Sequence, residues 1–176
     1  MGVAKAALLE PQTEGESGVL PAAVVIGGGI SGLMAAASLV DQGIETHLVE
    51  ASDRLGGLLG EVTTIGPEGR DARALVSEVV KRLEASPKAH IHMKARVSDV
   101  KGFVGNFEVT VTGCDGEVKV PAGAVIVATG ARELSPAAEY GFGKYPEVVT
   151  QLELERRLAK GERPRRVVVI NCVGSG

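Results

Sequence analysis

The sequence predicts an α/β fold in which a parallel β-sheet carries a small antiparallel β-meander. Residues 22–50 run from an apolar segment of strand length through a glycine-rich turn and a helical pattern to a second apolar segment. Residues 105–123 alternate apolar and polar side chains around a turn, which is typical of antiparallel strands. Residues 124–131 return to a largely apolar run, which suits a strand buried on both faces of a parallel sheet.

The first 50 residues are expected to hold a linker followed by a β-α-β unit. Residues 1–21 are rich in proline, glycine and polar residues, as linkers are. Strands are expected at 22–27 and 44–50. Between them, residues 30–43 place apolar side chains at helical spacing, and Gly43 ends the helix. Two apolar strands joined by a helix favour parallel pairing.

The remaining elements follow from the same patterns. Residues 71–86 share one apolar face and predict a second helix that Pro87 ends. In the helix expected at 150–161, Thr150 and Glu153 have the spacing of a capping box. Further strands are expected at 90–97, 105–113, 117–123, 124–131 and 166–170.

The composition disfavours several kinds of partner. The chain of 176 residues has a net charge of −3, which gives no electrostatic reason to expect nucleic acid or an anionic membrane surface. No apolar run approaches the roughly 18 residues that span a bilayer. The two cysteines, Cys114 and Cys172, form no CxxC pair and no disulfide framework. We therefore expect a reducing, cytoplasmic location.

The turn after the first strand carries the motif G-x-G-x-x-G at Gly27, Gly29 and Gly32. The first glycine permits a tight turn, the second lets the backbone approach a pyrophosphate, and the third lets helix and strand pack closely. The helix that begins there directs its free N–H groups at the phosphate. A strand before the motif and a helix after it predict a Rossmann-like dinucleotide site for FAD or NAD(P).

An acid at the end of the second strand narrows the choice of dinucleotide. Glu50 follows the glycines by about 20 residues, where a carboxylate accepts hydrogen bonds from a ribose diol. An acid there favours an unphosphorylated ribose, and so FAD or NAD over NADP. Arg54 and the pair Gly56 and Gly57 come next, at a place where a long dinucleotide needs a second close backbone approach. A glycine-rich surface turn is the alternative for these residues.

The histidines and cysteines predict no further chemistry. His90 and His92 lie on one face of an expected strand, as two metal ligands would, but no third ligand lies near them in the sequence. We therefore expect a solvent-facing strand without a metal, and a packed or edge position for His47. Cys114 falls in an exposed hairpin, and Cys172 has no partner, which favours a structural role.

The order of these motifs, ending on the ATG of residues 128–130, resembles the FAD domain of flavoproteins with two dinucleotide-binding domains, of which glutathione reductase is a familiar member. Within that group the chain is similar to the A subunit of heterodisulfide reductase over nearly its whole length. The segments VGNFEVTV, YPEVVTQLELE and CVGS carry this closer likeness. The resemblance implies an FAD-dependent, electron-transferring oxidoreductase, of a kind that bifurcates electrons in its better-known complexes, with iron–sulfur and disulfide-reducing subunits as partners.

The resemblance also implies which residues contact FAD, while it assigns no catalytic residue. Val97 is an expected contact because the meander strand of such proteins meets the adenine with its backbone. Residues 128–130 are expected contacts because they close against the cofactor. The expected contacts are Gly27, Gly29, Ile30, Ser31, Gly32, Glu50, Ala51, Arg54, Gly56, Gly57, Leu58, Val97, Ala128, Thr129 and Gly130.

Two departures from the family pattern limit what carries over. No CxxxxC follows Gly57, so dithiol chemistry beside the flavin is not expected. Two cysteines are also too few for an iron–sulfur cluster, which needs four thiolates. We expect a linker at 1–21, an FAD-binding domain at 22–131, and at 132–176 a connecting segment with the first strand of a truncated second nucleotide-binding domain. The chain therefore looks cut at both ends and inactive alone.

Two alternatives remain open. One is a fragment of an amine-oxidase or desaturase-like flavoprotein, in which a similar R-x-G-G segment follows the ribose acid. The other is a cofactor-free structural module that pairs with itself as a homodimer through exposed apolar surface.

Overall fold

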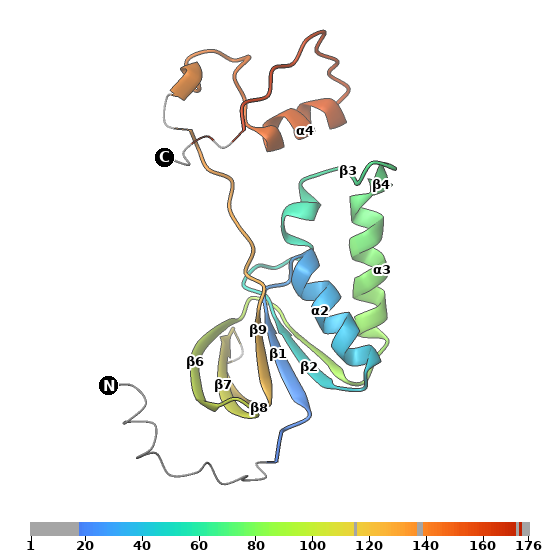
Figure 1. Cartoon of the computed structure of the whole chain (residues 1–176), viewed down its shortest axis with the longest axis vertical. Helices are drawn as coiled ribbons and strands as arrows, with labels where there is room; N and C mark the ends of the chain where they lie inside the picture. The colour runs from blue at the N-terminus through green and yellow to red at the C-terminus, as the bar shows by residue number, and fades with distance from the viewer. Residues whose placement is uncertain (1–17, 115, 137–138, 172, 174–176) are drawn as a thin grey trace, which may run out of the picture.

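A four-stranded parallel sheet forms the centre of the structure, a computed structural model that describes residues 18–114, 116–136, 139–171 and 173. All of its strand pairs are parallel, and its position between two layers is visible in Figure 1. The strands, in the order β5-β2-β1-β9, are Ala89–His92, Glu45–Val49, Ala22–Ile26 and Ala124–Val127. The predicted α/β fold is confirmed.

Two helices cover one face of this sheet (Figure 1). They are α2 (Ile30–Asp41) and α3 (Ala72–Glu84), and the side chain of Asp71 caps α3 by accepting a hydrogen bond from the Ala74 N–H at 2.7 Å. Their apolar stripes meet the sheet in a core that includes the fully buried Leu33 and Leu48. The helical periodicity read from the sequence therefore defines the buried face.

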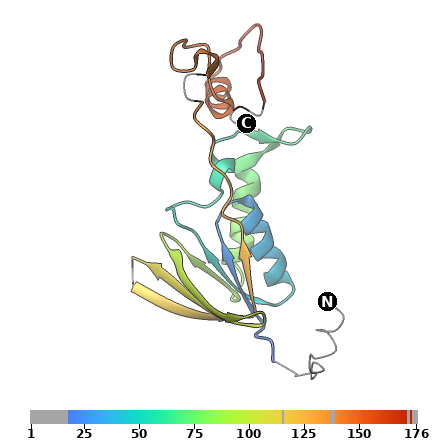
Figure 2. The same cartoon turned by 60° about the vertical axis from the view of Figure 1, so that its left-hand side comes forward.

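The meander covers the opposite face, and Figure 2 shows it as a separate layer. Its strands are β6 (Arg96–Phe103), β7 (Asn106–Gly113) and β8 (Gly116–Ala122), paired in that order. Val24 packs with the meander and Val25 packs with the helices, because successive side chains of a strand point to opposite faces. Strand β1 is apolar throughout since both of its faces are buried.

The structure corrects the strand predicted at 90–97. Residues 89–92 form β5 of the parallel sheet, and a separate strand, β6, begins at Arg96. Lys94 lies between them with a φ of 51°, a left-handed conformation that turns the chain. The strand from 96 to 103 was not predicted. The loop before α3 also contains a short 3-10 helix, η1 (Gly57–Gly60), and a hairpin of β3 (Thr64–Ile65) and β4 (Arg70–Asp71).

The C-terminal part rises away from the sheet as an extended segment, a short η2 (Glu139–Gly141) and the helix α4 (Gln151–Ala159) (Figure 1). The predicted capping box is confirmed, because Thr150 Oγ1 accepts from the Glu153 N–H and Glu153 accepts from the Thr150 N–H.

The strand predicted at 166–170 does not form, and Val168 is 88% exposed. No other described segment pairs with it, so its backbone has no sheet partner. The domain division at residues 131 and 132 stays a prediction, and residues 1–17 of the expected linker, together with Cys172, lie outside the described residues. Among the helices that are described, none has both the length and the apolar character to cross a membrane.

Replacing Leu48 by alanine is expected to lower the free energy of unfolding by about 2 to 5 kcal/mol, because Leu48 is fully buried between the sheet and the helices. The matched change Leu134→Ala removes the same atoms from a side chain that is 57% exposed and should cost less than about 0.5 kcal/mol. Urea denaturation of both variants measures the difference. Equal losses would contradict the placement of the core.

Candidate functional site

The turn between β1 and α2 divides its three motif glycines into two roles. A Cβ atom on Gly27 would lie 2.2 Å from the Ala128 carbonyl oxygen, and one on Gly32 would lie 1.8 Å from the Gly27 carbonyl oxygen. These two glycines are therefore required by backbone packing. A Cβ on Gly29 meets nothing within 4 Å. Gly29 thus presents bare backbone to space that a ligand can fill.

The same turn leaves the N-terminus of α2 open to an anion. Gly29 is the N-cap residue and makes no side-chain capping bond, and no acidic residue lies in the first turn. The N–H groups at the start of a helix have no partner within the helix, and its dipole favours negative charge. Ile30 and Ser31 are the first two residues of the helix and carry such groups. A phosphate group suits this end of α2.

Glu50 follows the last residue of β2 and reaches back to the glycine turn. Its Oε2 accepts a hydrogen bond from the Gly28 N–H at 2.6 Å, and its Oε1 accepts one from the Ser52 N–H at 2.7 Å. Partial burial raises the pKa of the Glu50 carboxyl, but the hydrogen bonds from Ser52, Gly28 and Ala51 outweigh burial and hold the pKa below its ordinary value. Glu50 is therefore a charged acceptor at neutral pH.

The pair Gly56 and Gly57 packs directly on the glycine turn. The Gly56 N–H donates to the Gly28 carbonyl oxygen at 2.8 Å, and Gly29 and Gly56 form an isolated parallel bridge. Gly57 has a φ of 53°, and a Cβ there would lie 3.2 Å from the Gly29 Cα. The next residue, Leu58, is 47% exposed. The second glycine segment thus borders the first.

Residues after β9 close the other side of the turn. The Ala128 N–H donates to the Ile26 carbonyl oxygen at 2.8 Å, which continues the pairing of β9 with β1. Thr129 lies beside Gly27, since the same Cβ on Gly27 would come within 3.1 Å of the Thr129 Cα. Gly130 follows with a φ of 69°. This segment meets the turn at the carboxyl edge of the sheet, where ligands bind in open α/β folds.

The meander also reaches this edge. The Ala95 N–H donates to the Glu50 carbonyl oxygen at 3.0 Å, so the start of β6 lies against the end of β2. Val97 stands two residues further along β6 and packs against the core between the sheet and the meander. Ala51, which follows Glu50, is exposed.

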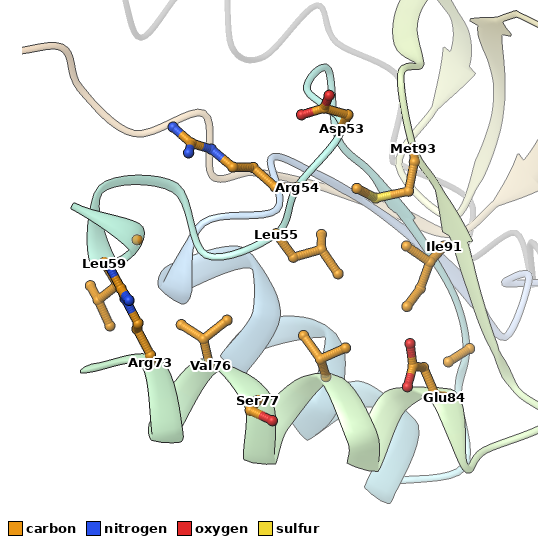
Figure 3. A pocket seen from close by; sticks show the side chains of 13 residues that line it. Asp53, Arg54, Leu55, Leu59, Arg73, Val76, Ser77, Glu84, Ile91 and Met93 are labelled. Atoms are coloured by element: carbon orange, nitrogen blue, oxygen red, sulfur yellow. The ribbon is translucent and has the colours of Figure 1, made fainter. Parts of the chain in front are cut away.

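A cavity of about 850 Å³ lies near the site but is distinct from it (Figure 3). It is formed by α3, the loop after β2 and β5, with Leu55, Val76 and Ile91 among its apolar walls. Of the residues predicted to contact FAD, only Arg54 lines it. The cavity is therefore separate from the glycine turn and from nearly all of the predicted FAD contacts.

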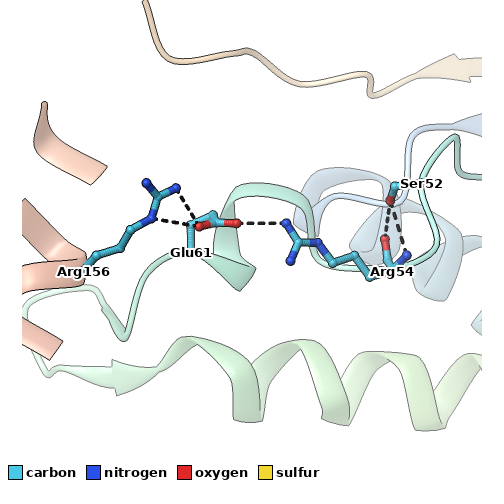
Figure 4. A network of polar contacts seen from close by, with 4 residues as sticks. All are labelled: Ser52, Arg54, Glu61 and Arg156. Atoms are coloured by element: carbon cyan, nitrogen blue, oxygen red, sulfur yellow. Dashed lines mark hydrogen bonds and ion pairs between the residues drawn. The ribbon is translucent and has the colours of Figure 1, made fainter. Parts of the chain in front are cut away.

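Arg54 belongs to a polar network that links the glycine-rich loop to α4 (Figure 4). Its Nη2 lies 2.9 Å from Glu61 Oε1, while Arg156 Nη2 on α4 lies 2.8 Å from Glu61 Oε2. The hydrogen bond and charge of Arg156 hold the pKa of the Glu61 carboxyl below its ordinary value. The guanidinium of Arg54 thus faces Glu61.

Three residues of this region were not predicted from the sequence. Gly28 donates the N–H that holds Glu50, and a Cβ on Gly28 would come within 2.6 Å of the Leu55 side chain. The run of three glycines at 27–29 in the sequence could have indicated that Gly28 also needs close backbone packing. Glu61 and Arg156 are far apart in sequence, and no local pattern could have paired them.

Comparison with known proteins identifies the family. The sequence profile of the family described as pyridine nucleotide-disulphide oxidoreductase matches residues 21–176. The chain belongs to this family. The family together with the fold identifies FAD as the dinucleotide of this domain. The bare backbone at Gly29, the uncapped end of α2 and the charged Glu50 all fit that cofactor.

Curated relatives confirm the narrower resemblance. One is the A 1 iron-sulfur subunit of the CoB--CoM heterodisulfide reductase of Methanopyrus kandleri, 27% identical over 98% of this chain and 40% of the relative. Another is the A subunit of the H(2):CoB-CoM heterodisulfide,ferredoxin reductase of Methanothermobacter marburgensis, 26% identical over 99% of this chain and 40% of the relative. The chain therefore spans about 40% of the length of these relatives.

Solved structures share the fold. The L-proline dehydrogenase from P. horikoshii is 26% identical with a TM-score of 0.56, and the match covers 65% of this chain and 23% of that one. The thioredoxin reductase of T. acidophilum, 22% identical with a TM-score of 0.52 over 65% of this chain and 37% of that one, agrees in fold alone.

Gly32→Ala is expected to lower stability, whereas Gly29→Ala is expected to weaken FAD binding. Gly32→Ala forces a Cβ into the Gly27 carbonyl oxygen and should lower the free energy of unfolding by about 3 kcal/mol. Gly29→Ala has room and should leave stability nearly unchanged, but it fills the space beside the open end of α2 and should weaken FAD binding at least about tenfold. Urea denaturation and flavin fluorescence titration measure the two effects. Equal losses of stability would refute the division of roles.

Proposed function

We propose that this chain forms the FAD-binding part of an electron-transferring oxidoreductase that resembles the A subunit of heterodisulfide reductase. One observation carries the proposal. The Glu50 carboxylate lies against the Gly28 amide, beside the bare backbone of Gly29, so that an acceptor for a ribose and an open helix end for a pyrophosphate face the same space. That pairing is what an FAD-binding member of this family requires.

Each group of predicted contacts has a part in holding the cofactor. The N–H groups of Ile30 and Ser31 bind the pyrophosphate at the end of α2. Glu50, which is charged at neutral pH, accepts hydrogen bonds from the hydroxyl groups of the ribose. The backbone of Val97 borders the adenine. Gly27 and Gly32 shape the turn by backbone packing. The other predicted contacts are small or exposed residues that admit close approach, namely Gly29, Ala51, Gly56, Gly57, Leu58, Ala128, Thr129 and Gly130, with Arg54 beside them.

We assign the electron acceptors to groups outside this part of the chain. Bound FAD supplies the two-electron chemistry. The segment after Gly57 contains no cysteine up to Cys114, so this part of the chain offers no dithiol beside the flavin. The relatives are named as A subunits of heterodisulfide reductases, and one of them as an iron-sulfur subunit. We therefore propose that electrons pass next to iron–sulfur groups outside this part of the chain, in such a subunit or in iron–sulfur partner subunits, and then to disulfide-reducing subunits.

The cysteine chemistry supports a cytoplasmic location for this function. Cys114 is a free thiol exposed to solvent. Exposed thiols persist where the compartment is reducing.

Replacing Glu50 by glutamine is expected to weaken FAD binding about 10-fold to 100-fold, because the ribose loses a charged acceptor and such bonds contribute about 1.5 to 3 kcal/mol. The matched change Glu117→Gln alters an exposed carboxyl on β8, in the meander, and should leave the affinity unchanged. Flavin fluorescence titration gives both affinities.

Thermal unfolding of the same variants without FAD provides the control for this experiment, since Glu50 also holds the amides of Gly28 and Ser52. A lower affinity in a Glu50→Gln protein that still unfolds cooperatively supports the ribose role. Equal FAD affinity in both variants would argue against it, and a wild-type chain that takes up no FAD would overturn the assignment.

A further inference from the structure

All three histidines of the chain lie together at one edge of the parallel sheet. His47 is on β2, and His90 and His92 are on β5, the edge strand beside it. The register pairs His47 directly with His90. The ring of His47 stacks on those of His90 and His92, with centroids 4.5 and 5.3 Å away. Glu45, two residues before His47 on the same face of β2, joins the group.

The nitrogen and oxygen atoms of this cluster lie close to one another. Glu45 Oε1 lies 3.2 Å from His90 Nε2 and 3.7 Å from His47 Nε2. One ligand atom from each of these three residues lies within 4.8 Å of the other two. Two atoms bound tetrahedrally to one zinc ion at about 2.0 to 2.1 Å are about 3.3 Å apart. The separations involving Glu45 are already close to that value.

His92 orients the ring of His47. His47 Nδ1 and His92 Nε2 are 3.0 Å apart, at hydrogen-bonding distance. When Nδ1 of His47 donates this bond, its Nε2 carries a lone pair directed toward the Glu45 side. A hydrogen bond to the second ring nitrogen is how metal-ligating histidines are held in one tautomer.

We propose that Glu45, His47 and His90 form a binding site for a divalent transition metal ion, with Zn²⁺ as the expected occupant. Two imidazoles and a carboxylate are a zinc donor set, and water completes the four ligands. Imidazole nitrogen selects such ions over Mg²⁺ and Ca²⁺, which prefer oxygen. His92 is the positioning residue of the site.

The site joins β2 to the edge strand β5, which has no other neighbour among the described strands. Backbone pairing joins the two strands from Thr46 to Val49, and the Glu50 N–H extends it to the His92 carbonyl oxygen at 2.9 Å. A bound ion adds a further link to this pairing and to the histidine contacts. None of its ligands is among the residues assigned to FAD, so the proposal stands independently of the proposed function.

The test uses the untagged 176-residue chain without FAD and with both cysteines replaced by serine, so that histidines and carboxylates are the donors. Isothermal titration with Zn²⁺ should give one site per chain, and Co²⁺ should give the visible absorption of a tetrahedral complex. At a free Zn²⁺ concentration about 100 times the dissociation constant, the melting temperature should rise by about 5 to 10 °C.

Three variants of the cluster and one control variant distinguish the site from adventitious binding. His90→Gln and Glu45→Gln change partly or fully exposed side chains, so they should preserve the fold and weaken Zn²⁺ binding at least about tenfold. His92→Gln should weaken binding less than His90→Gln, because it removes a positioning bond. Glu117→Gln, an exposed carboxyl of the meander, should bind Zn²⁺ as the wild type does.

Either of two results would overturn the proposal. One is that the parent chain does not bind Zn²⁺. The other is that His90→Gln and Glu45→Gln bind Zn²⁺ as tightly as Glu117→Gln.

Discussion

The hydrogen bond from the Gly28 amide to the Glu50 carboxylate is the contact on which the site depends. It joins the end of β1 to the end of β2 at 2.6 Å, where the Gly27 N–H also donates to the Val49 carbonyl oxygen at 2.8 Å. A carboxylate that accepts backbone N–H bonds stays ionised and holds one orientation. The charge that we propose binds a ribose is therefore positioned by the same backbone that forms the turn. The fold and the candidate site share one set of bonds at this edge of the sheet.

Close backbone packing explains why three segments distant in sequence converge there. Without side chains at Gly27 and Gly32, the turn approaches the start of α2 and the end of β9 at distances that no Cβ atom permits. Gly56 then brings the loop after β2 onto the same turn by bonding the Gly28 carbonyl oxygen. The two covered faces of the sheet support this arrangement, because Leu48 and Val49 pack the end of β2 into separate cores.

Local patterns in the sequence were sufficient to predict several elements of the fold. The β-α-β unit, the helix α3 and the capping box of α4 depend on residues close together in the chain, so spacing alone defines them. The boundary at Lys94 could not be found this way, since alternation looks the same in a parallel edge strand and in a meander. The strand expected at 166–170 lacked the neighbour that a strand needs.

Contacts between distant residues were beyond reach for the same reason. The bridge from Glu61 to Arg156 depends on where α4 lies, and the meeting of His47 with His90 depends on the register of β2 and β5. Neither contact can be predicted from the spacing of residues along the chain. The glycine turn at residues 27–32 was predictable because its motif lies within six residues. Glu50 was predictable because the acid of this motif follows the glycines at a nearly constant distance along the chain.

The most direct measurement of the central claim is an NMR titration of the ¹⁵N-labelled chain with ADP, which carries the adenosine ribose and diphosphate of FAD without its flavin. The amide signals of Gly29, Ile30, Ser31 and Gly57 should move together and saturate at one affinity, with Glu50 and Ser52 following. Shifts concentrated instead at residues of the α3 cavity, such as Ser77 and Glu84, would contradict the placement of the dinucleotide on the glycine turn.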